Sequence, residues 1–218
     1  MVSTSRSRKR VAPERLPARD RRSQLLRTAA ELLRREGIDG LELTRLAAEA
    51  GVSRPIVYRF FESRHALIVG LLEDLASELD ARFARLTARP FPVRIEDATR
   101  LFVDAACDAI EAKGVGPWEL LGSRGPDPAI ARLAGRIHKR LLAPWYARVA
   151  AATGVGAREA ETLSSMLVAA ARAVLQEWYT GGITREEAVR DATRGVSGLL
   201  AAFAAGASSA PPRRRRPS

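Results

Sequence analysis

The strongest constraint on this sequence is the spacing of three residues between positions 43 and 61. Ala47 is followed four positions later by Gly51, and Val57 comes six positions after that glycine. Two short helices that cross at a steep angle need a small side chain where their backbones meet, a residue that tolerates positive φ in the turn, and an apolar residue that closes their small core. The spacing therefore predicts a helix-turn-helix, with an ordinary helical hairpin as the alternative.

The flanking residues extend this pair into a unit of three helices. Apolar residues recur at helical spacing over residues 19–35, and Gly37 stands where a C-terminal cap is expected. Ser53 occupies the N-cap position of the last helix, and Pro55 fits its first turn because a missing N–H costs nothing there. Ser63 is in position to cap a long helix that follows without a flexible linker.

Four short segments occur in a fixed order across residues 19–72, namely EGIDG after the first helix, LAAEAGVS, VYRFF, and ESRHAL at the start of the long helix. In this order they resemble the TetR family of one-component transcriptional repressors. The sequence departs from the usual pattern at Glu42, where a Ser or Thr cap is common, at Arg64, where a lysine is common, and at Ile56 and Phe60. The resemblance implies an N-terminal DNA-binding domain, and beyond it only the layout of the chain is similar.

Basic residues are concentrated at the two ends of the chain. Of the formal net charge of +11, residues 1–22 carry +6 from eight basic and two acidic groups, and Arg213–Arg216 add +4. Both ends are rich in Ser, Pro and Arg, so they lack the apolar surface that folding needs. We expect the N-terminal tail to contact DNA, whereas the role of the C-terminal one stays open. The predicted domains are a disordered basic tail over 1–18, a helix-turn-helix DNA-binding domain over 19–66, a helical effector-binding and dimerisation domain over 67–206, and a disordered Pro/Arg tail over 207–218.

The sequence holds no motif that is typical of an enzyme. The HExxH, CxxC, GxSxG and Walker patterns do not occur, so we expect no catalytic activity, no cofactor and no metal. The single cysteine, Cys107, excludes an intramolecular disulfide and is expected in the helical core. No apolar run follows the basic N-terminus, and the longest uncharged stretch, 195–212, is too weakly apolar to span a bilayer. We therefore expect a cytoplasmic protein with no membrane partner.

The residues after the DNA-binding unit predict a second, larger helical domain, so the expected fold class is all-α. Asp127 is typical of an N-cap, Thr184 with Glu187 of a capping box, and Pro144 should kink or divide its helix. Apolar periodicity predicts helices over 95–113, 118–121, 127–153, 162–176 and 184–205.

Two C-terminal segments are apolar nearly all round. Between Thr162 and Gln176 the only charged residue is Arg172, and residues 195–205 contain none. A helix without a polar face must be covered on both sides, and the simplest cover is the same pair of helices from a second subunit. We therefore predict a homodimer with a four-helix interface. The candidate interface residues are Leu163, Leu167, Ala170, Val174, Val196, Leu199, Leu200 and Phe203.

A dimer with two such motifs can place its recognition helices in successive major grooves, about 34–36 Å apart, on a palindromic site. Arg54 and Arg59 are the side chains best able to reach guanine, and Pro55 and Ile56 can touch a thymine methyl. A nucleoid-type protein that binds DNA without sequence preference is the alternative, because basic tails would serve it equally well. The residues expected to hold phosphates are Thr44, Arg45, Ser53, Tyr58 and Arg64.

The remaining helices resemble the effector domain of the family, in which a small molecule lies among the helices and shifts the DNA-reading heads. Few charged residues are expected on the inner faces, so we predict a mostly apolar effector, such as an aromatic compound or an acyl chain, that releases the protein from DNA. The candidate lining residues, which are large, aromatic or polar in an apolar setting, are Phe102, Trp118, His138, Trp145, Met166 and Gln176.

Overall fold

The computed structural model describes residues 17–87, 94–122 and 127–209, in which all regular structure is helical. The all-α prediction is confirmed. The two predicted tails lie outside the described residues, except that α1 already begins at Ala18 and α9 extends to Ser209. The elements are α1 (Ala18–Glu36), the short 3₁₀ helix η1 (Ile38–Gly40), α2 (Leu43–Glu49), α3 (Arg54–Phe60), α4 (Arg64–Thr87), α5 (Ile95–Lys113), α6 (Val115–Gly122), α7 (Pro128–Thr153), α8 (Ala157–Tyr179) and α9 (Arg185–Ser209).

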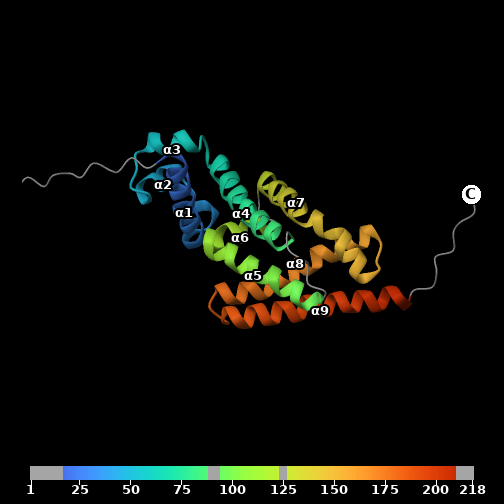
Figure 1. Ribbon diagram of the computed structural model, residues 1–218. Coiled ribbons are helices and arrows are strands. Elements are labelled where there is room, and N and C mark those ends of the chain that lie inside the picture. The colour runs from blue at the N-terminus through green and yellow to red at the C-terminus, as the bar shows by residue number, and fades with distance from the viewer. Residues whose placement is uncertain (1–16, 88–93, 123–126, 210–218) are drawn as a thin grey trace, which may run out of the picture.

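Helices α1, α2 and α3 form a small head at one end of the molecule (Figure 1). The residues picked out by their spacing close its core, since Ala47 is 3% and Val57 0% exposed. The turn between α2 and α3 contains Gly51 at φ 64°, a value that favours glycine, and Gly37 ends α1 at φ 70°. The arrangement is therefore a helix-turn-helix supported by α1.

Local capping interactions place several of the helix starts where they were predicted. The Ser63 Oγ accepts a hydrogen bond from the Ala66 N–H at 3.1 Å, at the start of α4. The carboxylate of Asp127 caps α7 in the same way. At the start of α9 the Thr184 N–H donates to the Glu187 carboxylate at 2.8 Å, which closes the predicted capping box.

Two prolines lie within helices of the body. Pro144 does not divide α7, which runs as one element over Pro128–Thr153, so of the two predicted effects only a kink remains. The helix predicted over 118–121 begins earlier, at Val115, with Pro117 in its first turn. Proline is tolerated there because the N–H groups of a first helical turn have no intrahelical partner.

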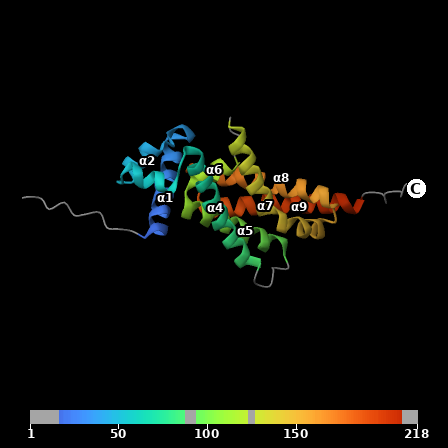
Figure 2. The same ribbon diagram turned by 90° about the horizontal axis from the view of Figure 1, so that it is seen from above.

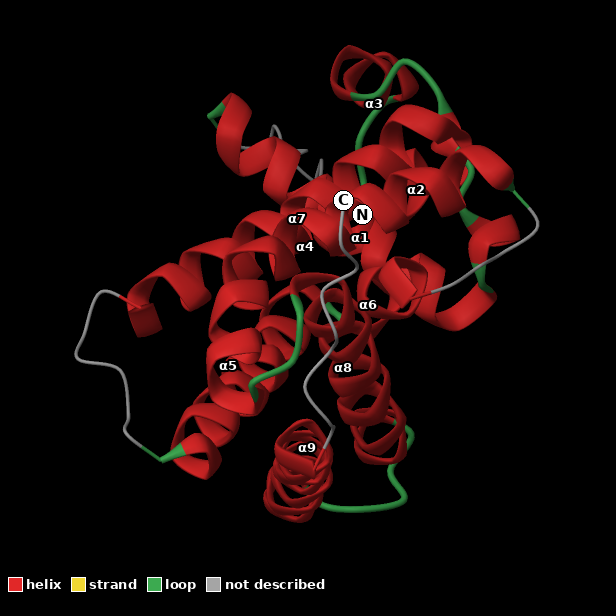
Figure 3. Cartoon of the chain, turned by 90° about the vertical axis from the view of Figure 1, so that its right-hand side faces the viewer, coloured by secondary structure: helices red, strands yellow, loops and turns green. Residues whose placement is uncertain are grey.

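Helix α4 joins the head to a larger helical body without a break (Figure 1). Helices α5 and α7 pack against α4, and α8 and α9 pack against each other and against α7, while α9 also contacts α5. Helix α6 lies between the body and α1 of the head. Seen from above, the head and the end of α9 lie at opposite ends of an elongated molecule (Figure 2). Helices α8 and α9 pack along each other on the side of the body away from α3 (Figure 3).

Candidate DNA-binding surface and effector cavity

Helix α3 carries one buried anchor and an exposed polar side. Val57 fixes the helix against α2, whereas Arg54 and Arg59 are exposed and Tyr58 is 49% exposed. The guanidinium of Arg59 lies 5.2 Å from the ring centre of Phe60. Ser53 stands at the N-cap position, but its side chain makes no capping hydrogen bond. Helix α3 therefore presents arginine, tyrosine and serine side chains to solvent, as a helix that reads a major groove must.

The two other candidates on α3 have apolar side chains. Pro55 is exposed at the first turn, and Ile56 is half-buried. Apolar contact with a thymine methyl needs only such a small exposed surface.

The two arginines among the candidate phosphate contacts already have partners within the protein. Arg45 forms an ion pair with Glu36 at 2.7 Å, and Thr44 is half-buried. Arg64 donates to the carbonyl oxygen of Ile38 and lies 3.3 Å from Asp39. These bonds tie α2 to the end of α1 and α4 to η1, and each guanidinium keeps further N–H donors that can reach a phosphate.

The body encloses a cavity of about 250 Å³ among α4, α5, α6, α7, α8 and α9. Four of the predicted lining residues lie on its wall, one of which, Trp118, comes from the short helix α6. The prediction is corrected for Met166, which is 42% exposed, and for Gln176, which is also exposed, because both lie on the outer side of α8. The predicted residues on the wall are Phe102, Trp118, His138 and Trp145, and α8 contributes Ser164, Leu167, Val168, Ala171, Arg172 and Leu175.

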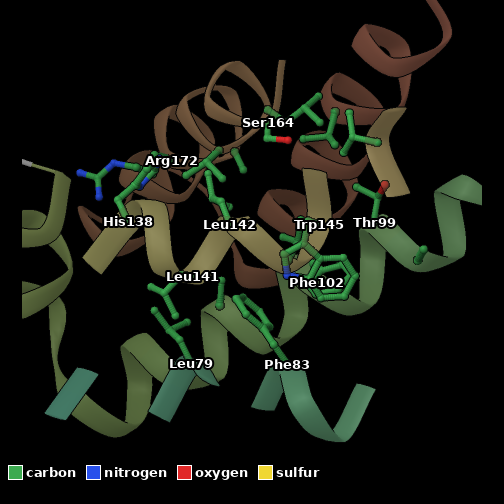
Figure 4. A pocket seen from close by; sticks show the side chains of 18 of the residues that line it. Leu79, Phe83, Thr99, Phe102, His138, Leu141, Leu142, Trp145, Ser164 and Arg172 are labelled. Atoms are coloured by element: carbon green, nitrogen blue, oxygen red, sulfur yellow. The ribbon is translucent and has the colours of Figure 1, made fainter. Parts of the chain in front are cut away.

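The two ends of the cavity differ in chemistry (Figure 4). At one end the ring of Phe102 makes edge contacts with Phe83 at 5.0 Å and with Trp145 at 4.1 Å between ring centres. At the other end lie His138 and Arg172. Burial lowers the pKa of His138 below its usual value, and the positive charge of Arg172 adds to this effect. His138 is therefore held in its neutral form at pH 7.

The cavity contains more charge than the sequence suggested. Arg148 and Arg172 both line it, which corrects the expectation that few charged residues face inward. Burial lowers the pKa of Arg172 from its ordinary range. The signal for this residue was its isolation as the single charge between Thr162 and Gln176. No comparable signal marked Arg148.

Half of the predicted interface residues are covered within the chain itself. Leu163 is 0% exposed, and with Leu167, Val196 and Leu200 it forms a core between α8 and α9. These four were expected to meet a partner, and that expectation is corrected because the seam between the two helices already buries them. Ala170, Val174, Leu199 and Phe203 are half-buried.

Beside that seam, α8 and α9 expose a stripe of small and apolar residues. Gly195 and Gly198 face open space, since a Cβ added to either would meet no atom within 4 Å. An exposed helix face without charge is unusual in a protein that stays monomeric. This exposed stripe consists of Met166, Ala169 and Ala173 on α8 and of Gly195, Gly198, Ala202 and Ala205 on α9.

Comparison with known proteins identifies the head of the molecule. The family model for bacterial regulatory proteins of the tetR family matches residues 25–71, which span most of α1, the helix-turn-helix and the first part of α4. The head is thus a DNA-binding domain of the TetR type. The matched segment includes α3 and leaves most of the body unmatched.

Sequence relatives match the same segment. The nucleoid occlusion factor SlmA of Mannheimia succiniciproducens is 35% identical over 72 residues, which are 33% of each chain. The HTH-type transcriptional regulator EthR of Mycolicibacterium smegmatis is 33% identical over 80 residues, 37% of this chain and 36% of that protein. The chain thus matches about a third of the length of these relatives.

The fold likeness extends over the whole body. A TetR-like transcriptional regulator from Rhodococcus sp. RHA1 superposes with a TM-score of 0.70 at 20% identity, covering 88% of this chain and 100% of that one. At this identity the likeness concerns the fold alone.

The described residues show no metal site and no membrane-spanning helix. They contain no group of three or more His, Cys, Asp or Glu side chains placed to hold a metal ion. None of their helices is long and apolar enough to cross a membrane. Cys107 is free and buried in the core, as predicted, and burial raises its pKa to about 11, so its thiol stays protonated.

Proposed function

We propose that this chain is a ligand-responsive transcriptional regulator, in the first place a repressor, that binds a palindromic operator as a homodimer and is released by a small molecule. The observation that carries the proposal is the position of α6. Trp118 of α6 lines the cavity, and two residues earlier Gly116 lies against α1 of the head. One short helix thus contacts both the ligand cavity and the DNA-reading unit.

A second connection runs through α4. Leu79 and Phe83 of α4 line the cavity, and the same helix begins at Arg64 beside the head. Arg140 of α7 holds α4 through ion pairs with Glu73 at 3.4 Å and Asp80 at 3.5 Å. A ligand that moves α4 or α6 changes the position of the head, and a shift of this kind alters operator affinity by a coupling free energy of about 1–3 kcal/mol.

The exposed stripe on α8 and α9 supports a homodimer. Its residues are small and uncharged, so two copies can bring their helices close together and bury the stripe in a four-helix interface. A two-fold axis between the copies gives two α3 helices, and such an arrangement matches a palindromic site. The dimer therefore accounts for both the stripe and the type of DNA target.

A competition assay at physiological salt tests the proposal against binding without sequence preference. The rival function is favoured by one relative's name, nucleoid occlusion factor. The protein is first allowed to select a duplex from random DNA, and the complex is then challenged with bulk DNA. A regulator should hold its selected duplex against a large excess, since specific binding is typically about 10³-fold or more tighter than non-specific binding. Equal competition by bulk DNA would favour the nucleoid-type alternative.

A further inference from the structure

The end of the cavity formed by α6, α7 and α8 contains donors of hydrogen bonds in excess of acceptors. Arg172 donates to the carbonyl oxygen of Trp118 at 2.9 Å, and its Cζ lies 5.2 Å from the centre of the Trp118 ring. The indole N–H of the same tryptophan is buried without an acceptor in the described part of the chain. His138 lies beside Arg172 on the same wall (Figure 4).

The charge of Arg172 has no direct counterion there. Glu119 and Tyr179 are near enough to act on it electrostatically, but among the described residues no carboxylate forms an ion pair with its guanidinium. A guanidinium has five N–H donors, and one hydrogen bond to the protein is found here. The remaining N–H donors are free to bind an anionic group that enters the cavity.

The guanidinium also packs closely on the backbone at the end of α6. A Cβ on Gly122 would lie 1.8 Å from the Arg172 Cζ. Any larger residue at position 122 would displace it. A donor that is positioned before the ligand arrives binds a matching acceptor more strongly, because less motion is lost.

We infer that the effector is an organic carboxylate: its carboxylate pairs with Arg172 beside His138, and its apolar part extends toward Phe83, Phe102 and Trp145. This inference rests on the proposed function, because it names the chemical class of ligand for the same cavity. It corrects the expectation of a mostly apolar effector by adding one negative charge at one end.

A carboxylate fits this end better than a phosphate. Its single charge neutralises the guanidinium of Arg172, and its two oxygens match the planar fork of an arginine. A phosphate dianion would need a second cation nearby, but His138 is held neutral by burial and by Arg172, and Arg148 lies against Trp145 at the other end. The rings of Phe83, Phe102 and Trp145 form the opposite end of the cavity. That end suits the hydrocarbon or aromatic part of a ligand.

The same bond links recognition to release. One Arg172 donor holds the Trp118 carbonyl of α6, and a carboxylate would bind the donors that remain. A carboxylate that draws the guanidinium toward it therefore pulls on α6, and α6 is the helix that rests on α1.

A matched pair of probes tests the inference on the full-length protein. Decanoate and decanamide share a chain that suits a cavity of about 250 Å³, and they differ in charge. Calorimetry on the free protein should show decanoate binding roughly 10- to 100-fold more tightly, the range expected for hydrogen bonds to a charged group. R172Q keeps a donor for the Trp118 carbonyl and should bind both probes alike. R148Q, which removes the other cavity arginine, should retain the preference.

The outcomes separate this inference from the proposed function. Equal binding of the two probes to the wild-type protein, no binding of decanoate, or a preference lost in R148Q and kept in R172Q would overturn the carboxylate subsite. Operator binding is measured separately by fluorescence anisotropy. A clear preference for decanoate without any effect on operator affinity would keep the subsite and contradict release by ligand.

Discussion

Gly116 of α6 lies so close to Leu33 of α1 that a Cβ on the glycine would meet the Leu33 Cγ at 2.9 Å. The carbonyl oxygen of Ala30 would lie 3.0 Å from the same Cβ. Helix α6 therefore cannot move toward the head without displacing α1. Because Trp118 of α6 lines the cavity, this contact is a direct path from a ligand to the DNA-reading unit.

Enlarging Gly116 should separate α6 from α1. We expect G116A to lower the free energy of unfolding by about 1–3 kcal/mol, the usual cost of overpacking, and to weaken operator binding. G135A is the matched control, since a Cβ at this position on α7 meets nothing within 4 Å and should raise stability by up to about 1 kcal/mol. Urea unfolding and anisotropy measure both effects. A G116A protein with wild-type stability and affinity would show that the contact is loose.

Arg54 and Arg59 should carry base recognition. Replacing either with alanine should cost roughly 1–3 kcal/mol of discrimination at one operator position. R190A removes one charge from α9, far from α3, and should leave the preference unchanged. Binding to every single-base variant of the operator provides the measurement. The assignment fails if both variants keep the full wild-type preference.

The exposed stripe should form the dimer interface. A173E on α8 and A202E on α9 each place a carboxylate on that face, and burying an unpaired charge there should cost several kcal/mol of dimer stability, on the order of 3–5. A81E introduces the same charge at an exposed position of α4 and should remain dimeric. Sedimentation at micromolar concentration distinguishes the species. Dimers of both A173E and A202E would place the interface elsewhere.

The neutral His138 should make stability depend on pH. Burial holds its pKa below 6.5, so the folded state takes up its proton at lower pH than the unfolded state does. The difference in unfolding free energy between the wild type and H138Q should therefore be constant above pH 6.5, and the wild type should lose stability relative to the variant as pH falls below it. A difference that stays flat from pH 7.5 to 5 would mean that His138 titrates normally in the fold.

The head was predictable because short-range rules determine it. Gly37 and Gly51 occupy positions that require positive φ, and Ser63 caps the helix that follows it in the chain. Such rules involve residues a few positions apart, so one sequence is enough to apply them. They also placed Asp127 at the start of α7.

The cavity and the interface were only partly predictable, because periodicity marks an apolar face without saying what covers it. Leu163 and Leu200 were predicted to contact a second subunit, whereas they pack in the core between α8 and α9 of one chain. Met166 and Gln176 point outward because α8 turns its other side to the cavity. Arg172 was noticed as an isolated charge, but its place at the cavity depends on α6, which is distant in the sequence.

The sequence that the purified protein selects from random DNA tests the central claim most directly. The account predicts one enriched motif that is palindromic, with two half-sites whose centres lie about 10–10.5 base pairs, or a multiple, apart, so that two α3 helices meet one face of the duplex. The motif should be recovered at physiological salt, where non-specific contacts to phosphates are weak. Enrichment of a single unsymmetrical site, or of no site at all, would contradict a dimeric, operator-specific regulator.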